Sequence, residues 1–183
     1  MLLVAAVVLN SSAARAQPFV SAGAGLTVVS TPAVSVVPGS TSDSLGAAFQ
    51  ITFDAGWWLS SRVAVGIEVV NPAGVDFQQI VGRATVTETA RDVIISGVLR
   101  YKVVNGLEVI GGASLVSQHL GVGNFQDDPG VYNGGAVLGA DFPAHVNAHV
   151  AVVPSLRIQF INRSLSSVGE FVFQPSVAVR LSY

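Results

Sequence analysis

The 183-residue chain contains no cysteine, a single lysine and few charged residues of either sign. Without cysteine, the chain can form neither disulfide bonds nor thiolate metal sites. Charged residues make up 11% of the sequence, where a soluble domain usually carries about 25%. The net charge of -2 leaves no basic stripe that could displace the counterions of a phosphate backbone. We therefore expect no nucleic-acid partner.

Long apolar runs are also absent. The run at residues 2–9 is shorter than the roughly 20 residues that a helix needs to span a bilayer, which argues against a membrane anchor. After a polar break, the small residues of Ala14-Arg15-Ala16 suit cleavage by signal peptidase before Gln17. We predict that residues 1–16 are a signal peptide, that the chain is exported, and that residues 17–183 form one domain.

Apolar residues are nevertheless abundant. They make up 50% of the chain, and its mean hydropathy is +0.59, so the chain either buries an unusually large apolar area or lies next to lipid. A period of two recurs along the sequence, which is the pattern of β-strands with two unlike faces. We predict eight strands, at residues 18–30, 45–58, 62–71, 90–102, 107–118, 134–142, 145–161 and 171–183.

Each predicted strand has one apolar and one polar face. In residues 62–71, for example, the apolar face consists of Val63, Val65, Ile67 and Val69. Nearly all charged residues of the eight strands fall on the other face, where they are mixed with small residues. The charged residues of the polar face include Asp54, Glu68, Asp92, Arg100, Lys102, Glu108, Asp141, Arg157 and Arg180.

The connections between the predicted strands alternate in length. The tight turns LSSR, VVNG and PAH join strands two and three, four and five, and six and seven. The other connections are longer and polar, and the loops at 71–89 and 118–133 are long enough to contact another molecule. Short turns at one end and long loops at the other are typical of an up-and-down meander whose ends face different compartments.

Two all-β architectures fit this pattern. A soluble lipocalin-like barrel or sandwich would bury the apolar face, whereas an outer-membrane barrel turns it toward lipid and encloses the polar face. The small residues of the polar face suit a narrow lumen, and a soluble exterior would be rich in Lys and Glu. We therefore predict an all-β, eight-stranded antiparallel up-and-down transmembrane β-barrel with short periplasmic turns and longer extracellular loops.

Charges enclosed in such a lumen are expected to pair with one another, because an isolated buried charge is costly. We predict an ion-pair network that fills the lumen, and an ion pathway is the alternative. The predicted lumenal charge network comprises Asp54, Glu68, Asp92, Arg100, Glu108, Asp141, Arg157 and Arg180.

Aromatic residues gather where the predicted strands meet the tight turns. Outer-membrane barrels carry girdles of aromatic residues at both membrane interfaces. The predicted periplasmic girdle consists of Phe19, Trp57, Tyr101 and Phe142, with Tyr183 at the same end.

The mature chain as a whole resembles the small outer-membrane β-barrel proteins of OmpA/OmpX type. The segment GAVLGADFPAHVNAHVAVVPSLRIQF looks like the hairpin of strands six and seven in that family. The last strand, with Val177, Val179, Leu181 and Tyr183, is similar to the signal that the barrel-assembly machinery reads, although the family more often ends in Phe.

This resemblance implies an outer membrane of Gram-negative type, membrane lipid as a partner, contact with the assembly machinery during biogenesis, and a structural or interaction role. Envelope integrity, adhesion and an extracellular ligand bound through the loops all stay open. A narrow-channel porin and, less favoured, a soluble periplasmic lipocalin-like ligand binder are the alternatives.

Candidates for catalysis or metal binding are weak. Ser117 and His119 share a face near the acidic pair at 127–128, but their order does not match the lipid A deacylase motif. His145 and His149 would stand about 13 Å apart on a strand, too far to share a metal ion. We therefore expect no enzyme activity, no metal and no cofactor.

Overall fold

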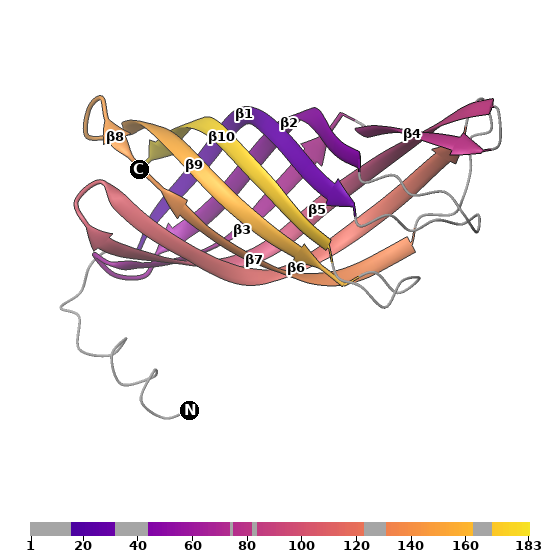
Figure 1. Cartoon of the computed structure of the whole chain (residues 1–183). Helices are drawn as coiled ribbons and strands as arrows, with labels where there is room; N and C mark the ends of the chain where they lie inside the picture. The colour runs from indigo at the N-terminus through magenta and orange to yellow at the C-terminus, as the bar shows by residue number, and fades with distance from the viewer. Residues whose placement is uncertain (1–15, 32–43, 74, 82–83, 123–130, 163–169) are drawn as a thin grey trace.

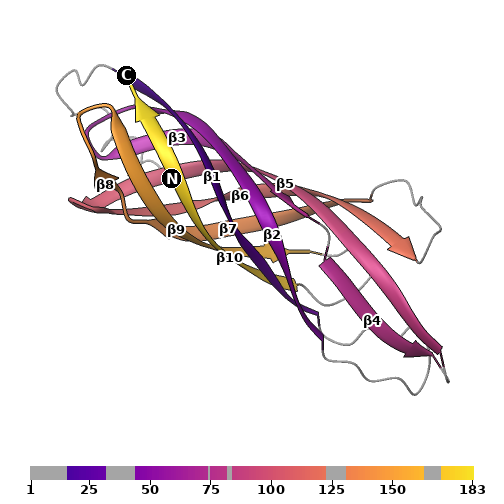
Figure 2. The same cartoon turned by 90° about the horizontal axis from the view of Figure 1, so that it is seen from above.

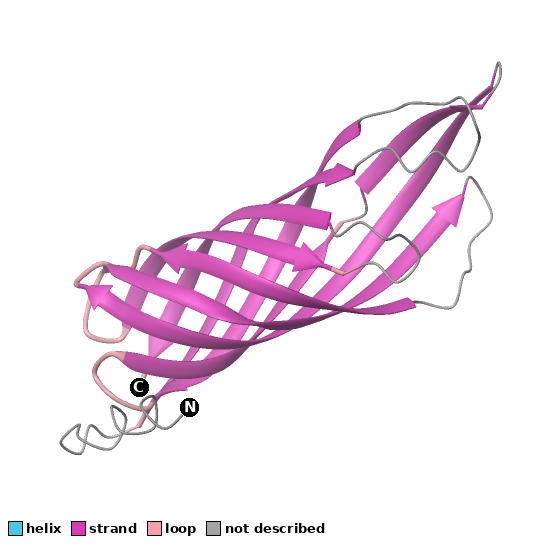
Figure 3. Cartoon of the chain, turned by 60° about the horizontal axis from the view of Figure 1, so that its bottom comes forward, coloured by secondary structure: helices cyan, strands magenta, loops and turns pink. Residues whose placement is uncertain are grey.

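The computed structural model describes residues 16–31, 44–73, 75–81, 84–122, 131–162 and 170–183. The predicted signal peptide, except its last residue, and the inner parts of three predicted loops, 32–43, 123–130 and 163–169, lie outside these ranges. Within them the chain is built of strands and turns (Figure 3). No helix of the described part has the length and apolar character needed to span a membrane.

The strands form one closed antiparallel sheet (Figure 1). Their bounds are β1 Gln17–Thr31, β2 Ser44–Trp58, β3 Val63–Pro72, β4 Val75–Val81, β5 Ala84–Val104, β6 Leu107–Val122, β7 Val131–Asp141, β8 Ala144–His145, β9 Val150–Ile161 and β10 Glu170–Ser182. The circuit runs β1-β2-β3-β5-β6-β7-β9-β10, and β10 pairs with β1 to close it. The predicted eight-stranded barrel is confirmed, because β4 and β8 are short strands beside this circuit.

Much of the loop predicted at 71–89 is a hairpin instead. β4 pairs with the first part of β5, from Val75 opposite Ala90 to Val81 opposite Ala84, and the hairpin projects beyond the rest of the barrel (Figure 2). Because the two arms satisfy each other's backbone hydrogen bonds, residues 84–87 of β5 stay extended although the described part of β6 does not pair with them. The prediction of a loop at 71–89 was therefore wrong for residues 75–81 and 84–89, which form strands.

The predicted strand at 145–161 starts later than expected. β9 begins at Val150, and the side-chain Oδ1 of Asn147 accepts hydrogen bonds from the backbone N–H groups of His149 and Val150, at 2.8 and 2.9 Å. An Asn side chain that binds the following backbone in this way stabilises a turn. The connection between β7 and β9 is therefore longer than the tight turn that PAH suggested.

The two faces of the barrel wall are those that the sequence predicted. On β3, Ile67 is 59% exposed while the next residue, Glu68, is 4% exposed. On β5, Leu99 is 53% exposed and Arg100 is 1% exposed. The apolar face thus lies outside and the polar face lines the lumen, which is the reverse of a soluble barrel.

Candidate functional site: the barrel lumen

Seven charged residues meet inside the half of the barrel that lies next to the short turns. Each comes from a different strand of the eight-stranded circuit, so the barrel brings together residues far apart in the sequence. We call these residues the charge cluster: Asp54, Glu68, Arg100, Glu108, Asp141, Arg157 and Arg180. All seven are buried.

Arg100 lies among three carboxylates. Its Nη2 is 2.6 Å from Oδ2 of Asp54 and 3.8 Å from Oε2 of Glu68, and its Nη1 donates to Oδ2 of Asp141. The eighth strand of the circuit, β1, contributes through Ser21, whose hydroxyl donates to Oδ2 of Asp54 at 3.0 Å. All eight strands of the barrel therefore take part in one polar network.

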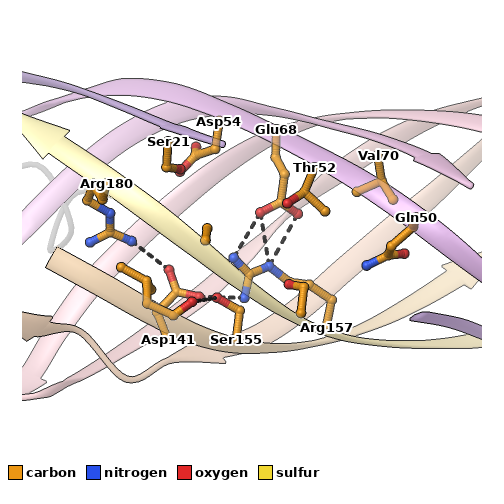
Figure 4. Close-up of a pocket in the computed structure, with 13 residues that line it drawn as sticks. Ser21, Gln50, Thr52, Asp54, Glu68, Val70, Asp141, Ser155, Arg157 and Arg180 are labelled. Atoms are coloured by element: carbon orange, nitrogen blue, oxygen red, sulfur yellow. Dashed lines mark hydrogen bonds and ion pairs between the residues drawn. The ribbon is translucent and has the colours of Figure 1, made fainter. Parts of the chain in front are cut away.

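Arg157 joins the opposite walls of the lumen (Figure 4). Its Nη2 lies 2.8 Å from Oε2 of Glu68, and its Nε lies 3.2 and 3.1 Å from the two carboxylate oxygens of the same residue. Nη1 of Arg157 donates to Oδ1 of Asp141 at 2.7 Å. Arg157 thus fixes the distance between β9 and β3, which are not neighbours in the sheet.

Asp141 holds the cluster together. Arg180 donates from Nη2 to Oδ2 of Asp141 and from Nη1 to Oε2 of Glu108, each at 2.8 Å. Asp141 therefore contacts all three arginines, Arg100, Arg157 and Arg180. Charge-assisted hydrogen bonds of this kind are about twice as strong as neutral ones, and they offset the cost of burial.

Asp92, the eighth residue of the predicted network, lies apart from this cluster. It is on β5, eight residues from Arg100 and toward the loop end, which places the two roughly 27 Å apart along the strand. Asp92 is half-buried and has Gln118 of β6 as its neighbour in the register. The structure brings the other seven together and leaves Asp92 at another level of the barrel.

Phe19 corrects the predicted girdle. It is 1% exposed, and the guanidinium carbons of Arg100 and Arg180 lie 5.4 and 5.3 Å from its ring centre. Phe19 has the parity of Ser21 on β1 and so points inward, where Gly56 of β2 leaves room for its ring. Phe19 forms the floor of the lumen below the charge cluster. The face of its aromatic ring attracts the two guanidinium groups through cation–π interactions, which add to the ion pairs with the carboxylates.

The other girdle residues face outward. Trp57, Tyr101 and Phe142 are exposed, as is Tyr183. Inside the same end, the ammonium nitrogen of Lys102 lies 4.8 Å from the ring centre of Trp58. The turn end therefore carries aromatic residues on both sides of the wall.

Above the charge cluster lies a layer of neutral polar side chains, which the sequence analysis did not single out. Ser114 bonds to the hydroxyl of Ser96 at 2.8 Å and donates to Oε1 of Gln159 at 2.9 Å. On the other side of the lumen, the hydroxyl of Thr27 donates to Oε1 of Gln50. These residues have the polar parity, which is the one signal that could have revealed them.

Toward its loop end, the described lumen has an apolar layer. A contiguous group of buried side chains, which we call the apolar collar, contains one residue from each of seven barrel strands: Val29, Ala48, Val70, Ile94, Val116, Ile161 and Val172. The sequence signal for this collar is that both parities become apolar there, as in Val69-Val70. At this level, seven of the eight barrel strands therefore contribute an apolar side chain to the lumen.

A small cavity of about 20 Å³ is left between these layers. Its lining includes Gln50, Asp54, Glu68, Arg157 and Arg180 (Figure 4). A space of this size holds one or two water molecules, which is too few for a continuous water-filled channel.

The predicted assembly strand closes the barrel. Val177, Val179, Leu181 and Tyr183 face outward, and β10, which holds the first three of them, pairs with β1 on one side and β9 on the other.

Of the residues considered for catalysis, Ser117 is half-buried on the outward parity of β6. The side chain of His119 and the acidic pair at 127–128 lie outside the described residues. His149 is exposed at the turn end, with Nδ1 3.0 Å from the carbonyl oxygen of Ser182.

Neither a protein-family model nor a curated protein matches the chain. Solved structures with the same fold do. Neisserial surface protein A is 13% identical, with 91% of this chain and 97% of that chain covered and a TM-score of 0.54. A major outer membrane protein from Thermus thermophilus is 14% identical, with 92% and 100% covered and a TM-score of 0.54.

A third similar structure is Ail, the attachment invasion locus protein of Yersinia pestis, in complex with the heparin analogue sucrose octasulfate. It is 11% identical, with 91% of this chain and 99% of that chain covered and a TM-score of 0.51. At such identities the likeness shows the fold alone. The chain has the fold of the small eight-stranded outer-membrane β-barrels, as its strand pattern predicted.

Proposed function

We propose that this protein is a non-conducting outer-membrane barrel with a structural or interaction role. The observation that carries the proposal is a lumen filled by side chains along the part that the structure describes: the aromatic floor, the charge cluster, the polar layer and the apolar collar. An eight-stranded barrel is just wide enough for its own side chains. The barrel would then serve as a rigid scaffold in the membrane and not as a pore.

The interaction part of the proposal concerns the loop end. The β4–β5 hairpin extends beyond the barrel there (Figure 2), and recognition often lies on segments that a rigid scaffold positions. The similar protein Ail, the attachment invasion locus protein, was solved in complex with a heparin analogue. We therefore propose a role in surface contact for this chain. Deletion of residues 75–90 should lower the binding of the protein in a cell-binding assay.

The membrane location has its own test. A closed barrel satisfies all its backbone hydrogen bonds within the sheet, so the protein in an envelope fraction should resist SDS until it is heated and run as a faster band before boiling. N-terminal sequencing of that band should begin at Gln17 if residues 1–16 are removed on export. A protein that washes off the membrane and shows no shift would contradict the proposed location.

Conductance separates the scaffold from the porin alternative. Purified protein in a planar bilayer bathed in concentrated KCl should give no discrete current steps, and a porin prepared in the same detergent serves as the positive control. Reproducible unitary steps from this protein would overturn the proposal. The proposal also includes no catalysis, so release of fatty acid from lipid A by the reconstituted protein would contradict it.

Biogenesis is the remaining part. We propose that the barrel-assembly machinery reads the outward residues of the last strand. Removal of Tyr183 should then lower the fraction of heat-modifiable protein in cells while the purified variant still folds in detergent. Equal assembly of both forms in cells would contradict this role.

A further inference from the structure

The small cavity lies at the boundary between the charge cluster and the polar layer. Its lining includes Gln50 and Thr52 of β2, Glu68 of β3 and Ser155 of β9. Its volume of about 20 Å³ exceeds the roughly 10–15 Å³ that one water molecule requires, and a polar lining of this kind is where buried water is found.

Three lining residues carry a buried polar atom that has no hydrogen-bond partner in the described part of the chain. They are Nε2 of Gln50, Oδ1 of Asp54 and Nε of Arg180. Gln50, Asp54 and Arg180 are 1%, 8% and 4% exposed, so bulk solvent does not reach them. A buried donor or acceptor without a partner is destabilising, and native proteins usually satisfy it with ordered water.

The chemistry of these atoms selects the ligand. Two N–H donor groups and one carboxylate acceptor can each be satisfied by water, which both donates and accepts hydrogen bonds. The N–H groups of Gln50 and Arg180 would repel a cation, and the carboxylates of Asp54, Glu68 and Asp141 would repel an anion. A larger neutral solute does not fit the volume.

We propose that this cavity is a buried water site, holding one or two molecules, enclosed by the apolar collar on one side and by the charge cluster and Phe19 on the other. The proposal rests on the sealed lumen of the proposed function. The cluster contains four carboxylates and three guanidinium groups, so one carboxylate charge has no cation of its own. Water at the free oxygen of Asp54 solvates that charge.

The test is water–protein cross-relaxation by NMR on the folded protein in lipid nanodiscs. The side-chain N–H signals of Gln50 and Arg180 should show dipolar cross peaks to water, with the rotating-frame experiment used to exclude hydrogen exchange. The Nη–H groups of Arg100 are the control, since they donate to Asp141 and Asp54 and Arg100 does not line the cavity. The methyl groups of Ile94 and Val116 in the collar report on the seal.

Cross peaks at Gln50 and Arg180, without cross peaks at the methyl groups of Ile94 and Val116, would support the site. No cross peak at either residue would overturn it. Cross peaks at the methyl groups of Ile94 and Val116 as well would mean that water passes the collar. That outcome would overturn the sealed barrel, and it is distinguishable from failure of the water site alone.

A pair of variants locates the water in this cavity. Ser155→Val adds volume to the lining and should abolish the cross peaks at Gln50 and Arg180, whereas Ser155→Ala removes only the hydroxyl and should retain them. Both variants are checked for the heat-dependent gel shift. Cross peaks that persist in a folded Ser155→Val protein would overturn the placement, and the measurement on the unaltered protein decides the matter if that variant does not fold.

Discussion

Arg157 and Glu68 form a multi-point ion pair across the lumen although 89 positions separate them in the sequence. Three short contacts, from 2.8 to 3.2 Å, orient the guanidinium on the carboxylate. Such a fork geometry has directional requirements that a lysine would not meet. The pair therefore acts as a strut between β9 and β3.

Loss of this strut should destabilise the barrel. Arg157→Ala leaves Glu68 and Asp141 buried with fewer cations, and breaking a buried pair in this way costs about 3–5 kcal/mol. The temperature at which the folded band disappears in SDS gels should fall. Arg157→Lys should recover only part of the loss. An unchanged temperature for Arg157→Ala would show that the cluster does not stabilise the fold.

The inward position of Phe19 leads to a second prediction. Phe19→Ala removes a fully buried ring below Arg100 and Arg180, and truncation of a buried Phe costs about 3–5 kcal/mol. Trp57→Ala, on the outward face of the same end, should cost much less, because lipid replaces the lost contacts. Urea unfolding in lipid vesicles measures both. A larger loss of unfolding free energy for Trp57→Ala than for Phe19→Ala would contradict the inward position of Phe19.

The seam between β1 and β10 depends on close approach at Gly25. A Cβ at this position would clash with the carbonyl oxygen of Pro175 and lie 2.6 Å from Cβ of Ser176. Because the nearest atom belongs to the backbone, Gly25→Ala should push the strands apart and lower the SDS-resistant fraction. Gly97→Ala is the matched control, since a Cβ there meets nothing within 4 Å. Equal effects of the two substitutions would contradict this interpretation of the seam.

The outward face offers a fourth prediction. Ile67→Arg would place a charge among lipid chains, at a cost of about 2–4 kcal/mol near the middle of the bilayer. Val104→Arg, at an equally exposed site beside the turn at Asn105 and Gly106, should cost little because it lies at the end of the barrel. The difference in unfolding free energy in vesicles checks this. If Val104→Arg is the more costly change, the membrane does not surround Ile67.

The sequence was most informative where neighbouring residues differ in chemistry. Ile67 beside Glu68 and Leu99 beside Arg100 were enough to assign the two faces, and the fold class followed from their repetition. Segments that contradict a simple alternation were harder. The arms of the β4–β5 hairpin were predicted as a loop because that connection is long and rich in turn and polar residues. The turn stabilised by Asn147 was predicted as part of a strand.

The lumen was predicted only in part. Parity identified the charged residues as inward-facing but did not show that Asp92 lies at a different level from Arg100, because height in a barrel depends on the tilt and stagger of strands. Phe19 was assigned to the girdle by its position near a strand end, although its parity matched the lumen. The unpaired side-chain atom of Gln50 has no signature in the sequence.

By itself, the sequence determined the two-faced strands, their number and the alternation of short and long connections. These properties are local, since they depend on residues next to each other and on the solvents that each face can meet. Only the tertiary structure decided that Arg157 pairs with Glu68, that Asp141 contacts three arginines and that Phe19 lies beneath them. Such pairings join strands that are not neighbours, and they arise when closure of the barrel sets which side chains share one level of the lumen.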